Sequence, residues 1–379
     1  MAAETESPPR PFFATAAKGT EGALRDELRE LRVPSVRADR GGVHFGGTLL
    51  DAMRVCYGSR IAVRVLARRG EFPAGSELAL YEGARALDLS DVLDPTRTLS
   101  VSATVKNSRL THSGYVAQKV KDALVDAQRA QAGRRSDVNR DDPDVRVVVH
   151  LDRDTAQVFL DLAGEALHKR GYRTESREAP IKETLAAAML RLSGWDRTRP
   201  LVDPMCGSGT LAIEGLMWAR NIAPGLLGRR YGFQRWACYG PREKDEMIAL
   251  RETAGERVLK ATDAPSVIAL DCDALAVQLA RKLARNAGVN VHVDRMDARE
   301  FMGVSPAGHV ITNPPYGVRI ARDEQFETGI ARAFRRLSGH RISAICHDAR
   351  LAEAMATRPQ QEHTLFNGDL ECRLFSWDI

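Results

Sequence analysis

The sequence has few cysteines, and none of them forms a Cys-x-x-Cys pair. Six cysteines are scattered along the 379 residues, at positions 56, 206, 238, 272, 346 and 372. Closely spaced thiols are the usual mark of structural zinc sites and of disulfide frameworks, so this spacing argues against both. Scattered cysteines are typical of proteins from a reducing compartment. We therefore expect no metal site and no disulfide framework.

The sequence also lacks long hydrophobic runs. No apolar stretch approaches the roughly 20 residues that a membrane-spanning helix needs. Residues 1–11 are acidic and contain proline, unlike a signal peptide. We therefore expect a cytoplasmic protein without a membrane partner. The net charge of +5 is modest and says little about other partners.

An apolar run at residues 309–312 leads into the sequence Asn-Pro-Pro-Tyr. Pro314 and Pro315 fix φ and remove two N–H donors, so the Pro314 carbonyl and the Asn313 amide can face a ligand with little conformational freedom. Two acceptors beside the aromatic face of Tyr316 suit a planar nucleobase that bears an exocyclic amino group. The alternative is a strand that simply ends in a Pro-Pro turn, and the dipeptide alone does not decide between the two.

A second motif, at residues 201–211, reads as a strand, a glycine turn and the start of a helix. Gly207 and Gly209 let the backbone approach a ligand closely, and the helix N-terminus faces that ligand. The turn also matches Gly-x-Gly-x-x-Ala, a weak sign of a dinucleotide site. Such a site needs an acid-terminated strand about twenty residues on. That strand comes late, at residues 267–271, after a mostly helical insertion at residues 242–262.

Taken together, these motifs resemble class I S-adenosylmethionine-dependent methyltransferases. They are most similar to the THUMP-containing large-subunit (23S) ribosomal RNA guanine-N2 methyltransferases. The similar stretches are spread over nearly the whole chain and are residues 12–45, 167–173, 179–188, 203–210, 313–317 and 367–372. Larger members of the family carry a second methyltransferase domain after the point where this sequence ends, so we expect one activity.

The resemblance implies an α/β fold class. A C-terminal Rossmann-like class I methyltransferase, a doubly wound sheet with an antiparallel terminal hairpin, is preceded by α+β ferredoxin-like and THUMP domains. The expected domains are a ferredoxin-like part at residues 1–60, a THUMP RNA-binding domain at residues 61–165 and a methyltransferase domain at residues 174–379. Parallel strands should end at Asp203, at Asp271, near Asp294 and at Thr312, with a fifth strand at residues 342–346. Asn367-Gly368 between two strand-like runs predicts the hairpin.

The resemblance also implies S-adenosylmethionine as the cofactor. The glycine turn would surround its methionine part, and Asp271 would accept hydrogen bonds from the ribose hydroxyls. Asp271 and Asp273 compete for that role and for capping the next helix. Asp297 would receive the adenine amino group, with Asp294 as the alternative. The expected cofactor residues are Thr184, Asp203, Pro204, Cys206, Gly207, Ser208, Gly209, Thr210, Asp271, Cys272, Asp297, Ala298 and Asn313.

The expected catalytic residues are Asn313, Pro314, Pro315 and Tyr316. Asn313 Oδ1 and the Pro314 carbonyl would hold the two amino hydrogens and aim the nitrogen at the methyl group. We expect no general base. Cys206 suggests a nucleophile, but amino-group chemistry needs no covalent enzyme intermediate.

Two basic stretches without acidic residues, 54–69 and 97–121, favour RNA phosphate as a partner of the N-terminal half. An ordinary solvated surface is the alternative. The expected RNA contacts are Lys106, Arg109, Lys119, Arg173 and Arg319.

The resemblance thus implies methyl transfer to the exocyclic N2 of guanosine, with ribosomal RNA as the expected substrate. A transfer RNA guanine-N2 enzyme and an adenine-N6 methyltransferase on RNA or DNA are the enzymatic alternatives. A non-catalytic RNA-binding assembly factor is the third. Neither the target nucleotide nor the oligomeric state can be read from the residues.

Overall fold

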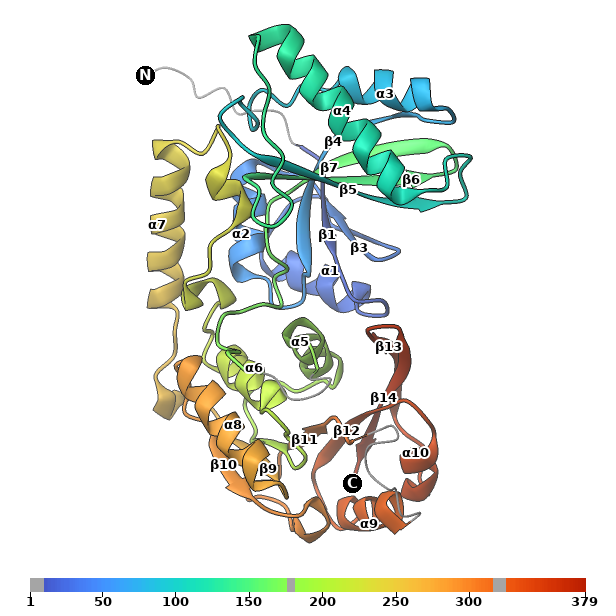
Figure 1. Cartoon of the computed structure of the whole chain (residues 1–379). Helices are drawn as coiled ribbons and strands as arrows, with labels where there is room; N and C mark the ends of the chain where they lie inside the picture. Colours follow the sequence, from blue (N-terminus) through green and yellow to red (C-terminus); the bar gives the residue numbers. More distant parts are fainter. Residues whose placement is uncertain (1–9, 176–180, 316–324) are drawn as a thin grey trace.

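The computed structural model describes residues 10–175, 181–315 and 325–379 and consists of two halves, each built on a seven-stranded sheet (Figure 1). The N-terminal half has the strand order β2-β3-β1-β4-β7-β6-β5. β4 is ten residues long and pairs with β1 near its start and with β7 along its length. One continuous sheet therefore runs through both the expected ferredoxin-like part and the expected THUMP domain of the N-terminal half. Its elements are β1 (Phe12–Thr15), α1 (Glu21–Glu30), β2 (Arg37–Asp39), β3 (Gly42–Phe45), α2 (Leu49–Gly58), β4 (Arg64–Pro73), α3 (Glu77–Arg85), β5 (Leu99–Lys106), α4 (Ser113–Ala132), β6 (Val145–Asp152) and β7 (Thr155–Asp161).

The C-terminal half has the strand order β10-β9-β8-β11-β12-β14-β13. The first five strands are parallel, and β14 and β13 are antiparallel additions at one edge. The expected doubly wound sheet with a terminal hairpin is confirmed. Its elements are α5 (Glu183–Leu192), β8 (Leu201–Asp203), α6 (Thr210–Ala219), η1 (Pro224–Leu227), η2 (Gly232–Arg235), α7 (Pro241–Glu256), η3 (Ala261–Asp263), β9 (Val267–Asp271), α8 (Ala274–Asn286), β10 (His292–Arg295), η4 (Ala298–Glu300), β11 (His309–Thr312), α9 (Gln325–Phe334), β12 (Arg341–Cys346), α10 (Arg350–Met355), β13 (Gln361–Asn367) and β14 (Leu370–Asp378).

Burial explains why these segments form their elements. All four residues of β11 are buried, as expected for a central parallel strand with both faces covered. α8 buries one stripe of small and aliphatic side chains against the sheet. α7 is the exception, because none of its sixteen residues is buried.

The strand ends expected at Asp203, Asp271 and Thr312 are confirmed. After α2, the next strand begins only at Arg64 and runs to Pro73. The reason is local, because the backbone N–H groups of residues 60 and 61 donate to the buried Glu27 carboxylate. These two N–H groups are therefore not available for hydrogen bonds to a neighbouring strand.

The two halves share a hydrophobic core. Buried residues of the N-terminal sheet, such as Phe12 and Val65, belong to the same cluster as Ala187 and Ala188 of α5 and Phe233. Within the described part of the chain, no helix is both long and apolar enough to cross a bilayer.

Candidate active site

The two sequence motifs meet at the centre of the C-terminal sheet. Parallel sheets bind ligands beyond the carboxyl ends of their strands, where the strand order reverses. That reversal falls between β8 and β11. The glycine turn follows β8, Asn313 follows β11, and the Thr312 hydroxyl donates to Asp203 Oδ1 at 2.8 Å. The structure thus places the predicted cofactor turn beside the predicted catalytic motif.

The glycine turn is fixed on one side and open on the other. Gly207 has a φ of +53°, and a Cβ added to it would meet no heavy atom of the described residues within 4 Å. Its N–H donates to Asp271 Oδ2 at 2.8 Å, and the Cys206 N–H donates to the Leu270 carbonyl at 2.9 Å. β9 therefore holds the turn in place, while the open side lets a ligand approach the backbone.

α6 begins directly after this turn, and no side chain caps its N-terminus. Its N-cap is Gly209, with φ +79°, and a Cβ there would lie 3.0 Å from that of Ala280. Close packing on α8 therefore requires glycine. The first N–H groups of the helix are left to bind an anion such as a carboxylate.

Asp203 is buried at the end of β8, and this burial raises its pKa to about 7. Hydrogen bonds from the Thr312 hydroxyl and from the Met205 N–H, at 3.2 Å, oppose that rise. The charge of Asp271 adds to it. A carboxyl group that titrates near neutral pH at a strand end is typical of a functional site.

Asn313 Oδ1 is buried and has no hydrogen-bond partner among the described residues. A buried acceptor without a donor costs free energy and is uncommon in folded proteins. A ligand N–H would remove that cost. Pro314 is buried, whereas Tyr316 and Arg319 lie outside the described residues.

Asp271 and Asp273 have separate roles in the structure. Asp273 caps α8 by accepting from the Leu275 N–H at 2.8 Å. Asp271 ends β9 and accepts from Gly207 and from the Asp273 N–H. The capping role considered for Asp271 belongs to Asp273, and Asp271 faces the glycine turn.

Asp297 and Asp294 both have partners within the chain. Asp297 caps η4 and pairs with Arg299, with 2.6 Å between Oδ2 and Nη2. Asp294 pairs with Arg281 at 2.9 Å. Burial, followed by the charges of Asp271 and Asp297, raises the pKa of the Cys272 thiol. Asp297 therefore lies near Cys272, and its assignment to the adenine amino group, with Asp294 as the alternative, stays a prediction.

Cys206 is buried within the turn. Burial, reinforced by Asp203 and Asp271, raises the pKa of its thiol well above the ordinary value. A neutral thiol is a poor nucleophile, which supports the interpretation that Cys206 is not one. Of the remaining cofactor candidates, Thr184 is buried in the first turn of α5, and Ala298 is buried in η4.

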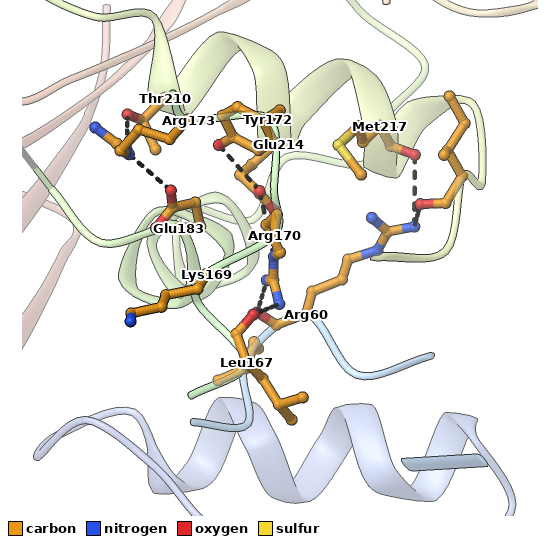
Figure 2. Close-up of polar contacts among 12 residues, drawn as sticks. Arg60, Leu167, Lys169, Arg170, Tyr172, Arg173, Glu183, Thr210, Glu214 and Met217 are labelled. Atoms are coloured by element: carbon orange, nitrogen blue, oxygen red, sulfur yellow. Dashed lines mark hydrogen bonds and ion pairs between the residues drawn. The ribbon is translucent and has the colours of Figure 1, made fainter. Parts of the chain in front are cut away.

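Arg173 points toward the glycine turn instead of toward solvent (Figure 2). Its guanidinium donates to Glu183 Oε1 at 2.8 Å, to Thr210 Oγ1 at 2.7 Å and to Ser208 Oγ at 3.4 Å. It joins the N-terminal ends of α5 and α6. The expected RNA contact of Arg173 stays a prediction, but its donors are already engaged inside the protein.

Arg170 joins the two halves below the same turn (Figure 2). Its side chain is 1% exposed and donates to the carbonyls of Arg60 and Leu167 and to Glu214 Oε1 of α6. The Tyr172 hydroxyl donates to the same carboxylate at 3.2 Å. The segment that leads into the C-terminal half is thus tied to the helix that follows the glycine turn.

The remaining RNA candidates lie at the other end of the molecule, around β5 and α4 (Figure 1). Lys106 and Arg109 are exposed, and Arg109 pairs with Asp154 at 3.3 Å. Lys119 lies 5.8 Å from the Tyr115 ring. These residues are separate from the glycine turn, so any shared ligand must be long.

Thr312 was not among the residues expected at the site. It is fully buried at the last position of an otherwise mostly apolar strand, and its hydroxyl binds Asp203. A polar residue at that position was the available signal.

Comparison with known proteins identifies the family. Residues 170–376, more than half of the chain, match the model described as RMKL-like, methyltransferase domain. The chain belongs to the RMKL-like methyltransferase family. Residues 74–161 match the THUMP domain, and residues 11–66 match the RlmL ferredoxin-like domain. The resemblance and the fold class expected from the sequence are confirmed.

The ribosomal RNA large subunit methyltransferase K/L of Methylococcus capsulatus is 40% identical over 383 residues, which are 98% of this RMKL-like chain and 51% of the relative. The chain spans about half the length of the curated relatives it matches. A putative methyltransferase solved in complex with SAH is 29% identical, with a TM-score of 0.90 over 98% of this chain and 99% of that one. A predicted N6-adenine-specific DNA methylase from Listeria monocytogenes is 27% identical, with a TM-score of 0.88, over 98% of this chain and 97% of that one.

Proposed function

We propose that this protein transfers a methyl group from S-adenosylmethionine to the exocyclic N2 of a guanosine in large-subunit ribosomal RNA. The observation that supports this most directly is Asn313 Oδ1, which is buried beside the open glycine turn and has no hydrogen-bond partner among the described residues. Curated relatives named ribosomal RNA large subunit methyltransferase K/L support the choice of RNA.

The residues around the turn suit the cofactor. The open side of Gly207 and the uncapped N-terminus of α6 provide backbone N–H groups for its carboxylate. Asp203 would accept from its amino group, and Asp271 from its ribose hydroxyls. S-adenosylmethionine, when bound, supplies an electrophilic methyl group on a sulfonium. The related structure solved with SAH supports this assignment.

Asn313 and Pro314 would hold the amino group of the base. The guanine N2 lone pair is conjugated with the ring, which makes this nitrogen a weak nucleophile. Accepting both of its hydrogens orients the nitrogen and stabilises the positive charge that develops on it. The proton can then leave to water, so the proposal includes no general base. Stacking on Tyr316 stays a prediction from the sequence.

RNA binding is assigned to the N-terminal half, with THUMP bounds of residues 61–165. The exposed Lys106 and Arg109 are candidates for phosphate contacts. A paired guanosine must leave its helix before transfer, which costs a few kcal/mol of unstacking.

The test of the substrate is transfer of labelled methyl groups to unmodified ribosomal RNA and to unmodified transfer RNA, at equal concentrations and salt. We expect label in the large-subunit ribosomal RNA. Label confined to transfer RNA would overturn the substrate assignment but leave the amino-group chemistry intact. Cofactor binding without transfer to either RNA would favour the assembly factor.

An adenine-N6 methyltransferase is the second candidate. The Asn-Pro-Pro-Tyr sequence suits either amino group, and one similar structure is described as a predicted N6-adenine-specific DNA methylase. Nucleoside analysis of the same product separates the two.

A further inference from the structure

A groove of about 780 Å³ lies far from the strand-order reversal, where the N-terminal half, the C-terminal half and α7 meet. Its walls come from α1, α2, the C-terminal ends of α5 and α6, and α7. The glycine turn is at the opposite end of α6, which is ten residues or about 15 Å long. A base bound at the glycine turn and Asn313 therefore cannot also lie in the groove.

The unpaired charges of this groove are mostly positive. Six arginines and three glutamates line it. Glu27 is used by Ser59 and two backbone N–H groups, and Glu30 pairs with Arg191. Arg54 pairs with Asp51, and Arg60 donates to the Met217 and Ile222 carbonyls.

The three remaining arginines, Arg32, Arg197 and Arg257, are exposed and have no carboxylate partner among the described residues. Glu246 is the one acidic lining residue for which the described residues provide no partner. The groove thus presents an excess of positive charge that nothing in the described chain neutralises.

Two of these arginines occupy backbone positions that disfavour side chains. Arg32 has a φ of +58° and Arg197 a φ of +66°. Non-glycine residues carry a conformational cost there, and such costs concentrate at functional sites. Arg197 also stacks over Trp218, with 4.9 Å from its guanidinium to the ring centre, so its charge is held at the groove.

α7 provides the second argument. It belongs to the insertion between α6 and β9, and none of its residues is buried. α7 packs three partly buried side chains, Met247, Leu250 and Ala254, against the core, and most of its remaining surface is exposed. The helix also forms one wall of the groove, to which it supplies Glu246, Leu250 and, just past its end, Arg257.

We propose that this groove binds the phosphodiester backbone of a single-stranded RNA segment that flanks the target nucleotide. The inference rests on the proposed function, because it takes RNA as the substrate. Positive grooves with aromatic side chains are the usual binding sites for single strands. The phosphates lie along Arg32, Arg197 and Arg257, and the segment is anchored while the target base occupies the site at Asn313.

The test is RNA affinity as a function of salt for the triple variant Arg32→Gln, Arg197→Gln and Arg257→Gln. We expect a dissociation constant about tenfold higher at physiological salt. The slope of log affinity against log salt should fall by about 2, since each lost contact to a single strand contributes about 0.7. Affinity for SAH should not change.

The matched control removes three exposed arginines outside the groove, Arg40→Gln, Arg134→Gln and Arg285→Gln, for the same loss of net charge. It should change the slope by less than half as much. If the triple variant unfolds at a lower temperature than the wild type, Arg257→Gln alone replaces it in the same measurement. The expected change in its slope is about 0.7.

Equal affinities and slopes for the groove and control variants would overturn the proposal. The proposal would also be overturned if the triple groove variant no longer bound inorganic pyrophosphate, as measured by calorimetry, but kept its affinity for RNA. That result would indicate a site for a free anion. A wild-type protein that binds no RNA would instead contradict the proposed function itself, and the groove assignment with it.

Discussion

Asn313 is the single residue on which the proposed chemistry most depends. Asn313→Ala removes the acceptor proposed for the substrate amino group, so we expect transfer to slow by about 100-fold or more. Affinity for SAH should stay within about twofold. The measurement is single-turnover transfer together with calorimetry.

Asp271→Ala is the paired variant. Asp271 supports the glycine turn through the Gly207 N–H, so its loss should weaken SAH binding first. Equal loss of SAH affinity in the two variants would contradict the division of roles between them.

Because the buried carboxyl group of Asp203 titrates near neutral pH, we expect cofactor affinity to depend on pH. Burial raises its pKa to about 7, so the carboxyl group is largely protonated in the free protein below that pH. A neutral carboxyl binds the ammonium group of the ligand less well than a carboxylate does. SAH affinity should therefore rise as the pH increases from about 6 to about 8.

Asp203→Asn removes the titrating group and keeps an acceptor for Thr312. This variant should bind SAH with a nearly flat pH profile over the same range. A wild-type profile that is equally flat would show that Asp203 does not face the amino group.

At the scale of elements, Arg173 fixes the spacing of two helix ends. Its guanidinium ties Glu183 of α5 to Thr210 of α6, on either side of the glycine turn. Arg173→Met should weaken SAH binding by about tenfold, as expected when charge-assisted hydrogen bonds are lost. The KM for RNA should hardly change.

Arg191→Met is the control, because Arg191 lies at the other end of α5 and pairs with the exposed Glu30. It should leave SAH affinity unchanged. If Arg173→Met raised the KM for RNA and left SAH affinity intact, Arg173 would be the RNA contact that the sequence first indicated.

The sequence predicted the elements of this site better than their side-chain contacts. Strand ends at Asp203, Asp271 and Thr312 were predictable because apolar runs stop at polar residues. The direction of the Arg173 side chain was not predictable, since its partner Thr210 lies 37 residues away, beyond α5 and β8. The contact between Arg60 and Met217 spans 157 residues, and no local pattern encodes it.

At the scale of the whole molecule, one buried ion pair joins the halves. Arg170 and Glu214 are 1% and 0% exposed, with 3.5 Å between nitrogen and oxygen. Arg170→Met leaves the Glu214 charge uncompensated and should lower the free energy of unfolding by about 3 to 5 kcal/mol. Urea unfolding measures this.

Adding Glu214→Gln should restore much of that loss, because the second change removes the unpaired charge and keeps a partner for Tyr172. A double variant no more stable than Arg170→Met would show that packing, and not charge, determines the contribution of Arg170.

The central claim is best tested by identifying the methylated nucleoside. Unmodified large-subunit ribosomal RNA would be treated with wild-type protein and with Asn313→Ala, digested, and analysed by liquid chromatography and mass spectrometry. We expect N2-methylguanosine from the wild type and almost none from the variant, at equal occupancy of the cofactor site. N6-methyladenosine, or equal yields from both proteins, would contradict the account.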